Sequence, residues 1–501
     1  MQISLVSFNP VAAAVRENTA QLLEILKSPA PKGDILVFPE AALCGCPLFD
    51  LFDDKELLAQ NVAALKEISK SVKDTALIIG YMDKQDKAHT TAAAFIYKGK
   101  ITKIFDSELV CFKGKNLQIV VGAGPAECVA DDEADGVIFL QAQPYIKGNV
   151  SPRLEALKKF AKKQARPSFL CNLLGGGDGL IFDGLCAAAD KRGNLITLGP
   201  LFREQLLTVD TEEKNQAVCY RVAWQEELLD ALVFGLRDYV HKSGFDKVIF
   251  GLSGGIDSAF TAVLAAKALG GESVHCLSLP SYCTSDLSKS LAGQLAAKLR
   301  VNLEEVEVRP AMGAVKESLG HIVSHAKDST DQALQARLRT TILGALANEY
   351  HAMLISTDDK SEAAVGSGLL YVDADGCLQP LGDLYKTEIY ELARFINRTQ
   401  ELIPQGIIDR APTSELRPNQ KDEDSLPPYA VLDKILRAYL EEHQTAAQIA
   451  QKQQVKIALV KEILDRVNRA DLMRRLSAPA LQVSPHPLAQ TLRPIIKKID
   501  L

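Results

Sequence analysis

The stretch "FGLSGGIDSAF", residues 250–260, joins an apolar run to a helix-like run through two glycines. Gly254 and Gly255 allow a tight turn in which several backbone N–H groups converge on one anion. The next helix, expected to begin at Asp257 or Ser258, adds the partial positive charge of its amino terminus. The order of strand, glycine pair and helix therefore predicts a nest for pyrophosphate. It comprises Ser253, Gly254, Gly255, Ile256, Asp257 and Ser258.

Asp257 follows the glycine pair directly, and a carboxylate beside polyphosphate is the usual ligand for Mg²⁺. The alternative is an ordinary glycine-rich turn with Asp or Ser capping the next helix. That alternative is weaker here, because all parts of the nest occur in the required order. The stretch is not the G-x-x-x-x-G-K-[ST] loop, since no lysine follows the glycines at the required spacing.

The residues around this loop, from about 225 onward, alternate apolar runs with helical periodicity. Four runs read as strands: "KVIFGLSGG", "SVHCLSLPS", "NLEEVEV" and "MLISTDD". Helical segments separate them, which predicts a doubly wound parallel sheet with right-handed crossovers. Residues 426–478 read as a mostly helical tail that belongs to the same domain.

The amino-terminal part alternates short β-rich runs with amphipathic helices and predicts a separate α/β domain. The polar stretch "DTEEKNQAV", residues 210–218, is the natural boundary. We expect three parts: a first domain at 1–210, a linker at 211–224 and a second domain at 225–501.

The composition is that of an ordinary soluble protein, with 47% hydrophobic residues and a formal net charge of −6. This charge disfavours nucleic acid or an anionic membrane as a partner. No apolar run approaches the roughly 20 residues of a membrane-spanning helix. The ten cysteines are scattered rather than paired in a metal-binding spacing, which is typical of a reducing compartment. The sequence therefore predicts a cytoplasmic protein.

The loop S-G-G-x-D-S resembles the pyrophosphate loop of the ATP pyrophosphatases, which activate a substrate by adenylation. Four later stretches together resemble NAD synthetases, the last of them the glutamine-dependent form: "LQARLR" (334–339), "STDDKSEAAVG" (356–366), "PLGDLYKTEIYELAR" (380–394) and "RAPTSELRPNQKDEDSLPPY" (410–429). The resemblance implies ATP and Mg²⁺ as cofactors and deamido-NAD as the substrate.

By this resemblance, Arg337 and Thr357 would contact ATP, and Glu362 would join Asp257 on Mg²⁺. Lys386 would neutralise phosphate charge, with Asp257 as the second catalytic residue and Thr413 nearby. A lysine and a metal suit adenylation, which builds negative charge around phosphorus.

The segment "GSGLLYVD", residues 366–373, departs from the family at Ser367, Leu369 and Val372 and keeps two residues. The resemblance implies that those two, together with a residue of the 380–394 stretch, bind the substrate: Tyr371, Asp373 and Asp383. The departure leaves open a different carboxylate as the acceptor.

The first domain resembles the nitrilase superfamily, whose members hydrolyse amides with a Glu–Lys–Cys triad. "LVFPEAALCGCP" (36–47) fits the glutamate segment and makes Glu40 the triad carboxylate. The strand that should deliver the cysteine ends "LQIVVGAG", so Gly122 or Ala123 occupies the position of the nucleophile, and Ser107 that of the lysine. We therefore expect Glu40 to be vestigial. The substitutes to consider are Cys111, Cys128, Lys113 and Lys115, with Cys128 expected as a buried helix cysteine.

The expected architecture is an αββα nitrilase-like sandwich followed by a doubly wound parallel sheet of the ATP-pyrophosphatase type. The expected enzyme is a homo-oligomeric ligase that adenylates deamido-NAD and amidates it with ammonia, supplied free or by a partner glutaminase. Three alternatives stay open: a glutaminase that uses Cys111 or Cys128, an amide ligase for another carboxylate, and a non-catalytic nucleotide-binding protein.

Overall fold

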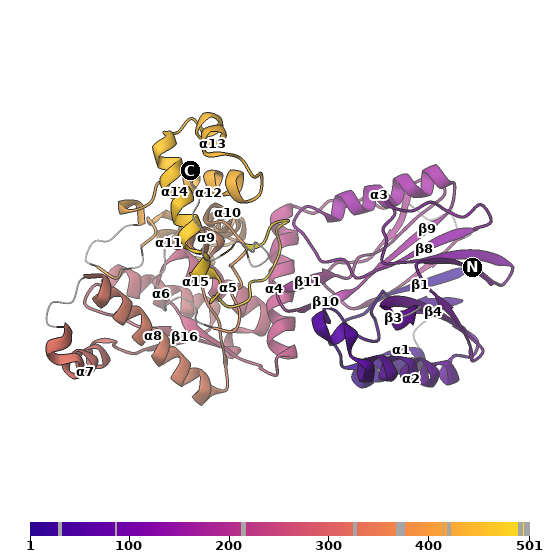
Figure 1. The fold of residues 1–501 in the computed structure, drawn as a ribbon. Helices are drawn as coiled ribbons and strands as arrows, with labels where there is room; N and C mark the ends of the chain where they lie inside the picture. The colour runs from indigo at the N-terminus through magenta and orange to yellow at the C-terminus, as the bar shows by residue number, and fades with distance from the viewer. Residues whose placement is uncertain are drawn as a thin grey trace. The chain divides into compact units, whose positions relative to one another are not determined.

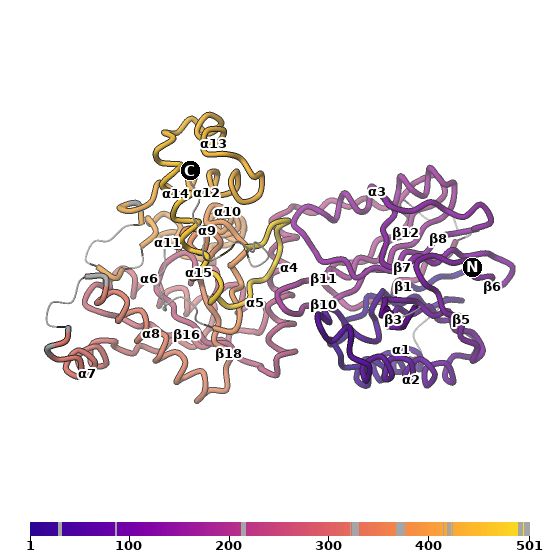
Figure 2. The backbone as a smooth tube through the Cα atoms, in the orientation of Figure 1, coloured from indigo at the N-terminus to yellow at the C-terminus, as the bar shows by residue number. Residues whose placement is uncertain are grey.

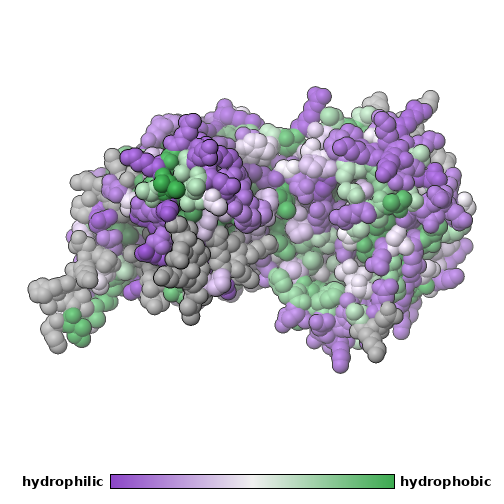
Figure 3. All heavy atoms as spheres, turned by 45° about the horizontal axis from the view of Figure 1, so that its top comes forward, coloured by the Kyte–Doolittle hydropathy of each residue, from purple (hydrophilic) through white to green (hydrophobic). Residues whose placement is uncertain are grey.

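The structure, a computed structural model, describes residues 1–28, 33–85, 88–211, 217–323, 328–366, 376–413, 415–417, 422–488 and 494. The chain divides into two compact units, Met1–Glu227 and Leu228–Leu501. The visible faces of both units carry mainly hydrophilic residues with scattered apolar ones (Figure 3). Among the described helices, none is both long enough and apolar enough to cross a bilayer.

The first unit contains two sheets, each with six strands in the described residues. The first sheet has the order β14-β1-β2-β3-β4-β5, in which β1, β2 and β3 are parallel. Its strands are β1 (Gln2–Ser7), β2 (Ile35–Val37), β3 (Ala76–Gln85), β4 (Ala88–Tyr97), β5 (Lys100–Ile104) and β14 (Gln205–Asp210).

The second sheet of this unit has the order β13-β12-β9-β8-β7-β6, with β7, β8 and β9 parallel. Its strands are β6 (Ser107–Phe112), β7 (Lys115–Val121), β8 (Gly136–Gln141), β9 (Ser168–Asn172), β12 (Cys186–Ala189) and β13 (Leu195–Leu198). A small hairpin, β10 (Leu174–Gly177) and β11 (Leu180–Asp183), lies beside it. Cys128 lies in the irregular stretch between β7 and β8, so its prediction as a helix residue is wrong.

Alternating residues of the two sheets form a shared apolar core, with Leu5 and Val37 from the first and Ile119 and Phe169 from the second. The helices α1 (Val15–Lys27) and α2 (Lys55–Ser71) cover the outer face of the first sheet. The helix α3 (Val150–Gln164) covers the second, where Phe160 meets Phe139 edge to face (Figure 1). The layers are α, β, β and α, as expected.

The second unit is built on a parallel sheet of order β17-β16-β15-β18. Its strands are β15 (Val248–Gly251), β16 (Val274–Ser278), β17 (Asn302–Glu305) and β18 (Met353–Leu354). The helices along this part of the chain are α4 (Trp224–Lys242), α5 (Ile256–Leu269), α6 (Asp286–Leu299), α7 (Arg309–Leu319) and α8 (Asp328–Tyr350) (Figures 1 and 2). The strand order reverses beside β15, and such switch points are where parallel α/β sheets bind ligands.

A helical part, which begins at Lys360 and contains the predicted tail of residues 426–478, follows the sheet and has an apolar core that includes Leu432 and Ile463. Its helices are α9 (Lys360–Val365), α10 (Lys386–Asn397), α11 (Gln405–Asp409), α12 (Tyr429–Leu440), α13 (Ala446–Gln453), α14 (Ile457–Arg469) and α15 (Asp471–Arg474). Helices α9 and α10 bring their amino-terminal residues to the site described next.

Candidate active site

The glycine loop lies at the carboxyl end of β15 and leads into α5, in the order read from the sequence. Gly254 has φ +80°, and a Cβ at this residue would lie 2.4 Å from the carbonyl oxygen of Ser288. Only glycine allows both the left-handed conformation and the close approach of α6. Gly255 is the N-cap of α5, so the first N–H groups of that helix are open to an anion.

Two serine hydroxyls hold the loop in shape. The backbone N–H groups of Ser253 and Gly255 donate to the Ser258 and Ser253 hydroxyl oxygens, both at 3.2 Å. The two hydroxyl oxygens lie 3.0 Å apart. Ser253 through Ser258, with Ile256 buried as the first residue of α5, therefore form the compact turn expected of the predicted nest.

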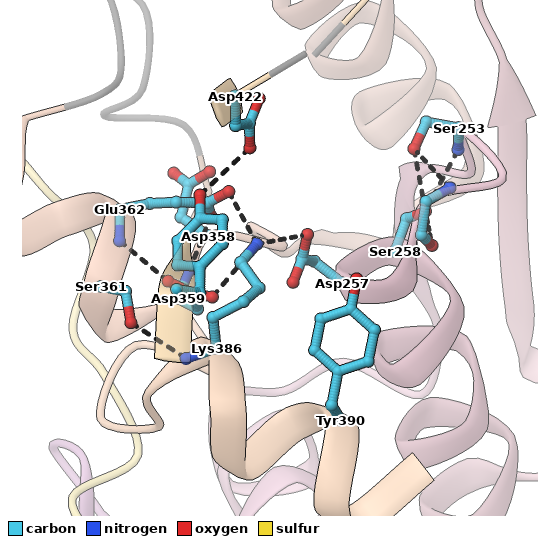
Figure 4. Close-up of polar contacts among 12 residues, drawn as sticks. Ser253, Asp257, Ser258, Asp358, Asp359, Ser361, Glu362, Lys386, Tyr390 and Asp422 are labelled. Carbon is cyan, nitrogen blue, oxygen red and sulfur yellow. Dashed lines mark hydrogen bonds and ion pairs between the residues drawn. The ribbon is translucent and has the colours of Figure 1, made fainter. Parts of the chain in front are cut away.

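A cluster of charges lies beside the loop, centred on the ammonium group of Lys386 (Figure 4). The Nζ atom of Lys386 is 2.7 Å from Asp257 Oδ2, 2.8 Å from Glu362 Oε1 and 3.1 Å from Asp359 Oδ2. It also lies 5.1 Å from the ring centre of Tyr429. The side chains of Lys386 and Asp359 are fully buried, so these contacts are screened little by water.

Three helix beginnings create this cluster. Asp257 lies in the first turn of α5, and Lys386 is the first residue of α10. Asp359 caps α9: its side chain accepts from the backbone N–H of Glu362, whose carboxylate accepts from the Asp359 N–H. A lysine at a helix amino terminus is electrostatically unfavourable by itself, so the three carboxylates are what make the position of Lys386 stable.

Burial raises the pKa of Asp257 to about 6, with Lys386 opposing the shift and Glu362 adding to it. Burial also raises the pKa of Asp359 well above its usual value. For Lys386, burial by itself lowers the pKa, but Asp257, Asp359 and Glu362 together hold it well above its ordinary range. The lysine is therefore a permanent cation at neutral pH.

The donor set of the cluster fits a divalent cation. Asp257 Oδ1 is buried and has no hydrogen-bond partner, although Oδ2 of the same carboxylate contacts Lys386. A hard cation such as Mg²⁺ takes one or two carboxylates together with substrate phosphates, and Asp257 and Glu362 offer two carboxylates beside the predicted nest.

Two cavities adjoin the loop, and Ser253, Ser288 and Glu415 line both. The larger, of about 170 Å³, also has Thr357 and Arg339 in its wall. The smaller, of about 30 Å³, has Thr413 in its wall. The structure thus brings the two predicted threonines to the loop, although they are distant from it in sequence.

Two residues predicted to contact the nucleotide or the substrate, Arg337 and Asp383, do not line these cavities. Arg337 is exposed on α8 and is absent from the residues that line them, whereas Arg339, two positions later, lines the larger one and donates to the carbonyl of Leu279. Asp383 is fully buried and accepts from Val483 N, Ser484 N and Ser484 Oγ. Tyr371 and Asp373 lie outside the described residues.

Reasoning from the sequence missed Asp359, Arg339 and Tyr390. Asp359 immediately precedes a helix and stands three residues before a glutamate, which is the signature of a capping box. Arg339 could have been found from helix phase, because residues two apart lie on different faces of a helix. Tyr390 lines the smaller cavity, and burial, with the charge of Asp257, raises its pKa to about 12.

Glu40 lies in the first unit, in the turn that follows β2. Its carboxylate accepts from Thr91 Oγ1 at 2.7 Å and from Ala142 N at 3.0 Å, and burial raises its pKa. A Cβ at Gly122 would lie 3.5 Å from Glu40 Oε1, and Gly122 has φ +77°. A side chain at position 122 would therefore contact the Glu40 carboxylate, but glycine has no side chain to offer.

The thiols of this unit are poorly suited to nucleophilic attack. Burial raises the pKa of Cys44 to about 12 and of Cys46 to about 11, and the charge of Glu40 adds to both shifts. Burial also raises the pKa of Cys128. Cys111 is exposed and pairs with Asn116, whereas Ser107, four residues earlier on β6, pairs with Val120 near Gly122. Because four residues of strand span about 13 Å, Cys111 lies that far along β6 from the end of the strand that is near Gly122.

The lysines considered as substitutes in this unit are both on the β6–β7 hairpin. Lys113 lies in the turn and makes an ion pair with Asp34, and Lys115 begins β7. Ser107 accepts a hydrogen bond from the Gln118 side chain at 2.9 Å.

The NAD synthase family model matches residues 228–477. A glutamine-dependent NAD(+) synthetase of Synechocystis sp. is 32% identical over 98% of this chain and 99% of its own length. A solved structure of the glutamine-dependent NAD+ synthetase from Acinetobacter baumannii in complex with ADP is 28% identical, covers 99% of this chain and 98% of its own and has a TM-score of 0.77. A Cytophaga hutchinsonii synthetase, 18% identical, shares the fold with the same coverage and a TM-score of 0.86. The chain therefore belongs to the family of glutamine-dependent NAD(+) synthetases, which are carbon–nitrogen ligases.

Proposed function

We propose that this chain makes NAD from deamido-NAD, ATP and free ammonia. A carboxylate oxygen of deamido-NAD attacks the α-phosphorus of ATP and forms an acyl-adenylate, while pyrophosphate leaves. Ammonia then attacks the acyl carbon, AMP leaves with the oxygen it gained, and the nitrogen gives up a proton to form the amide. Family membership supports the ligase reaction. The geometry of the two units supports the roles proposed for individual residues and the choice of ammonia as the nitrogen donor.

The second unit supplies the residues for adenylation. The backbone N–H groups that open α5, from Ile256 to Ser258, and the two serine hydroxyls are proposed to hold the departing pyrophosphate, while the N–H groups of Ser253 and Gly255 keep the loop in shape. Lys386 is proposed to stabilise the negative charge that builds on the α-phosphate, because it is a buried cation beside the nest. Thr357, Arg339 and Thr413 are proposed to contact the nucleotide from the cavity walls.

Mg²⁺, when bound, would neutralise phosphate charge and align the phosphates for displacement. Asp257 and Glu362 are the residues proposed to hold it, because Asp257 Oδ1 is buried and unpaired beside the loop. Asp359 is proposed to orient both of them through Lys386 and through the capping box of α9.

The proposal that free ammonia is the nitrogen donor rests on one observation: Gly122 faces Glu40 where a nucleophile would be needed. An amidase of this kind needs a thiolate held beside its base, with a lowered pKa. The residue at 122 has no side chain, and burial raises the pKa of Cys44, Cys46 and Cys128.

The first domain, residues 1–210, is accordingly proposed to serve as a non-catalytic module, with residues 211–224 as the linker and 225–501 as the synthetase domain. The chain is proposed to act as a cytoplasmic homo-oligomer, and the module to support that assembly or to dock a separate glutaminase.

A second candidate is hydrolysis of glutamine by this chain itself. The observation in its favour is that relatives 32% identical over nearly the whole chain are named glutamine-dependent. It requires Cys111 or Cys128 to reach Glu40 in a conformation different from the one described, because neither occupies the position at 122.

The deciding experiment is a steady-state assay of NAD formation with ATP and deamido-NAD, with ammonium compared against glutamine. We expect saturable turnover with ammonium, with AMP and pyrophosphate formed in equal amounts, and no turnover above background with ammonia-free glutamine. Turnover with glutamine that is lost in Cys111→Ala or Cys128→Ala would establish the second candidate. ATP binding without AMP formation from any acceptor would overturn the ligase assignment of this site.

A further inference from the structure

Lys360, the first residue of α9, has a fully buried side chain and directly follows Asp359 of the charge cluster. Its Nζ lies 3.0 Å from Asp383 Oδ1 and 3.1 Å from Glu441 Oε1. It also donates to Ser484 Oγ and to the His486 carbonyl, both at 2.9 Å. The ring centre of Tyr385 lies 4.9 Å away. The reaction proposed above does not use this group.

Two partners of Lys360, Ser484 and His486, belong to a segment distant in sequence, residues 479–486. Asp383 fastens this segment by accepting from the backbone N–H groups of Val483 and Ser484 and from the Ser484 hydroxyl, at 2.6–2.8 Å. Gln379 adds two backbone bonds, donating to Pro479 O at 2.8 Å and accepting from Leu481 N at 3.3 Å. A single buried ammonium thus joins this segment to the start of α9.

The same junction includes two of the three segments that carry the charge cluster, the starts of α9 and α10. The Lys360 N–H donates to the Leu384 carbonyl at 2.9 Å, and the Lys386 N–H donates to Ser361 Oγ at 2.9 Å. Tyr385, which precedes Lys386, donates to Glu441 Oε1 at 2.9 Å, the oxygen that Lys360 also contacts. Movement at Lys360 would therefore reach Asp359 and Lys386 through one or two residues of backbone.

We propose that Lys360 is a positioning residue for the adenylation step. By holding Asp383, Glu441 and Ser484 at one buried point, it sets the start of α9 relative to the start of α10. This spacing sets the distances from Lys386 to Asp359 and Glu362. The inference rests on the role proposed above for Lys386.

The physical reason is the charge balance of a dry site. Without the ammonium of Lys360, the carboxylates of Asp383 and Glu441 would face each other with no cation between them, and Tyr385 and Ser484 could satisfy only part of their hydrogen bonding. Like charges in a buried site separate or take up protons. Either change would shift the backbone of residues 383–385, because Asp383 is one of the two carboxylates and Tyr385 donates to the other. A displacement of about 1 Å at a catalytic group can cost about 100-fold in turnover.

The test measures kcat and the KM values for ATP and deamido-NAD, with ammonium as donor, in Lys360→Met and Ser484→Ala. The matched control is Lys298→Met, which removes an exposed ion pair with Glu401 in the same unit. Far-ultraviolet circular dichroism and thermal unfolding give the folded fraction of each protein. We expect kcat to fall about 100-fold in Lys360→Met and about tenfold in Ser484→Ala, with each KM within threefold and the control unchanged.

A kcat per folded molecule within twofold of the parent in both variants would overturn the inference, as would a rise in KM at unchanged kcat. If Lys360→Met does not fold, Ser484→Ala decides alone, because it keeps the buried cation and removes one hydroxyl. Lys386→Met distinguishes a failure of the role proposed for Lys386 from a failure of the role proposed for Lys360. Full activity in that variant would overturn the proposed role of Lys386, whereas its inactivity beside a normal Lys360→Met would overturn only the positioning role.

Discussion

Asp257→Asn removes a buried negative charge while it keeps the shape of the side chain. The folded protein holds the pKa of Asp257 at about 6, against an ordinary 3.8, because the carboxylate is buried. The ionised form is therefore disfavoured in the folded state. The protonated carboxyl of Asp257 instead stabilises the folded protein relative to the unfolded chain. This stabilisation is fully present below about pH 4 and is lost as the pH rises through about 6.

The interval between these pKa values corresponds to about 3 kcal/mol of difference between the charged and neutral forms. Since 21% of the Asp257 side chain is exposed, solvent screening reduces this, and we expect about 2 kcal/mol. The asparagine variant should be more stable than the parent by this amount at pH 8 and equal to it at pH 4. A gain of about 2 kcal/mol corresponds to a rise in Tm of roughly 4 to 8 °C.

The same substitution should lower ammonia-supported turnover at least 100-fold at pH 8, because it removes the proposed metal ligand. Thermal unfolding of both proteins at pH 4, 5, 6, 7 and 8, followed by circular dichroism, measures the stability difference. Asp246→Asn is the matched control: its side chain is 91% exposed, and its Tm should stay within about 1 °C of the parent.

Two results would refute this reasoning. If the Tm difference between Asp257→Asn and the parent is the same at pH 4 and pH 8, the carboxylate does not titrate between them in the folded state. If the variant keeps more than a tenth of the parental turnover, Asp257 is not part of the reacting site, and the reading of residues 253–258 as the phosphate nest loses its main support.

Gly254→Ala should raise the KM for ATP at least tenfold and lower the Tm, because its Cβ would lie 2.4 Å from Ser288 O at φ +80°; an unchanged KM would contradict this geometry. Arg339→Ala should raise the KM for ATP more than Arg337→Ala, since only Arg339 lines the cavity, and the reverse order in steady-state assays would favour the assignment made from the family resemblance. Glu40→Gln should leave ammonia-supported turnover within twofold, because the carboxylate faces a glycine; a tenfold loss would show that the first domain contributes to catalysis.

The sequence by itself determined the elements whose causes are local. The glycine loop was readable because strand, glycine pair and helix are contiguous, and the structure has Gly254 at positive φ and α5 beginning at Ile256, one residue before the expected start. The parallel sheet followed from strands that alternate with long helices. The sequence also placed Gly122 or Ala123 opposite Glu40, because a missing side chain can be read from the chain itself.

Only the tertiary structure decided which distant residues meet. Asp359 read as a helix cap, but the start of α10 brings Lys386 within 3.1 Å of it. Asp383 was expected at the substrate, yet it fastens residues 483 and 484. The choice between Arg337 and Arg339 depends on the rotation of α8. Such contacts arise from packing between elements far apart in the chain, and no local pattern encodes the distance or the rotation that packing produces.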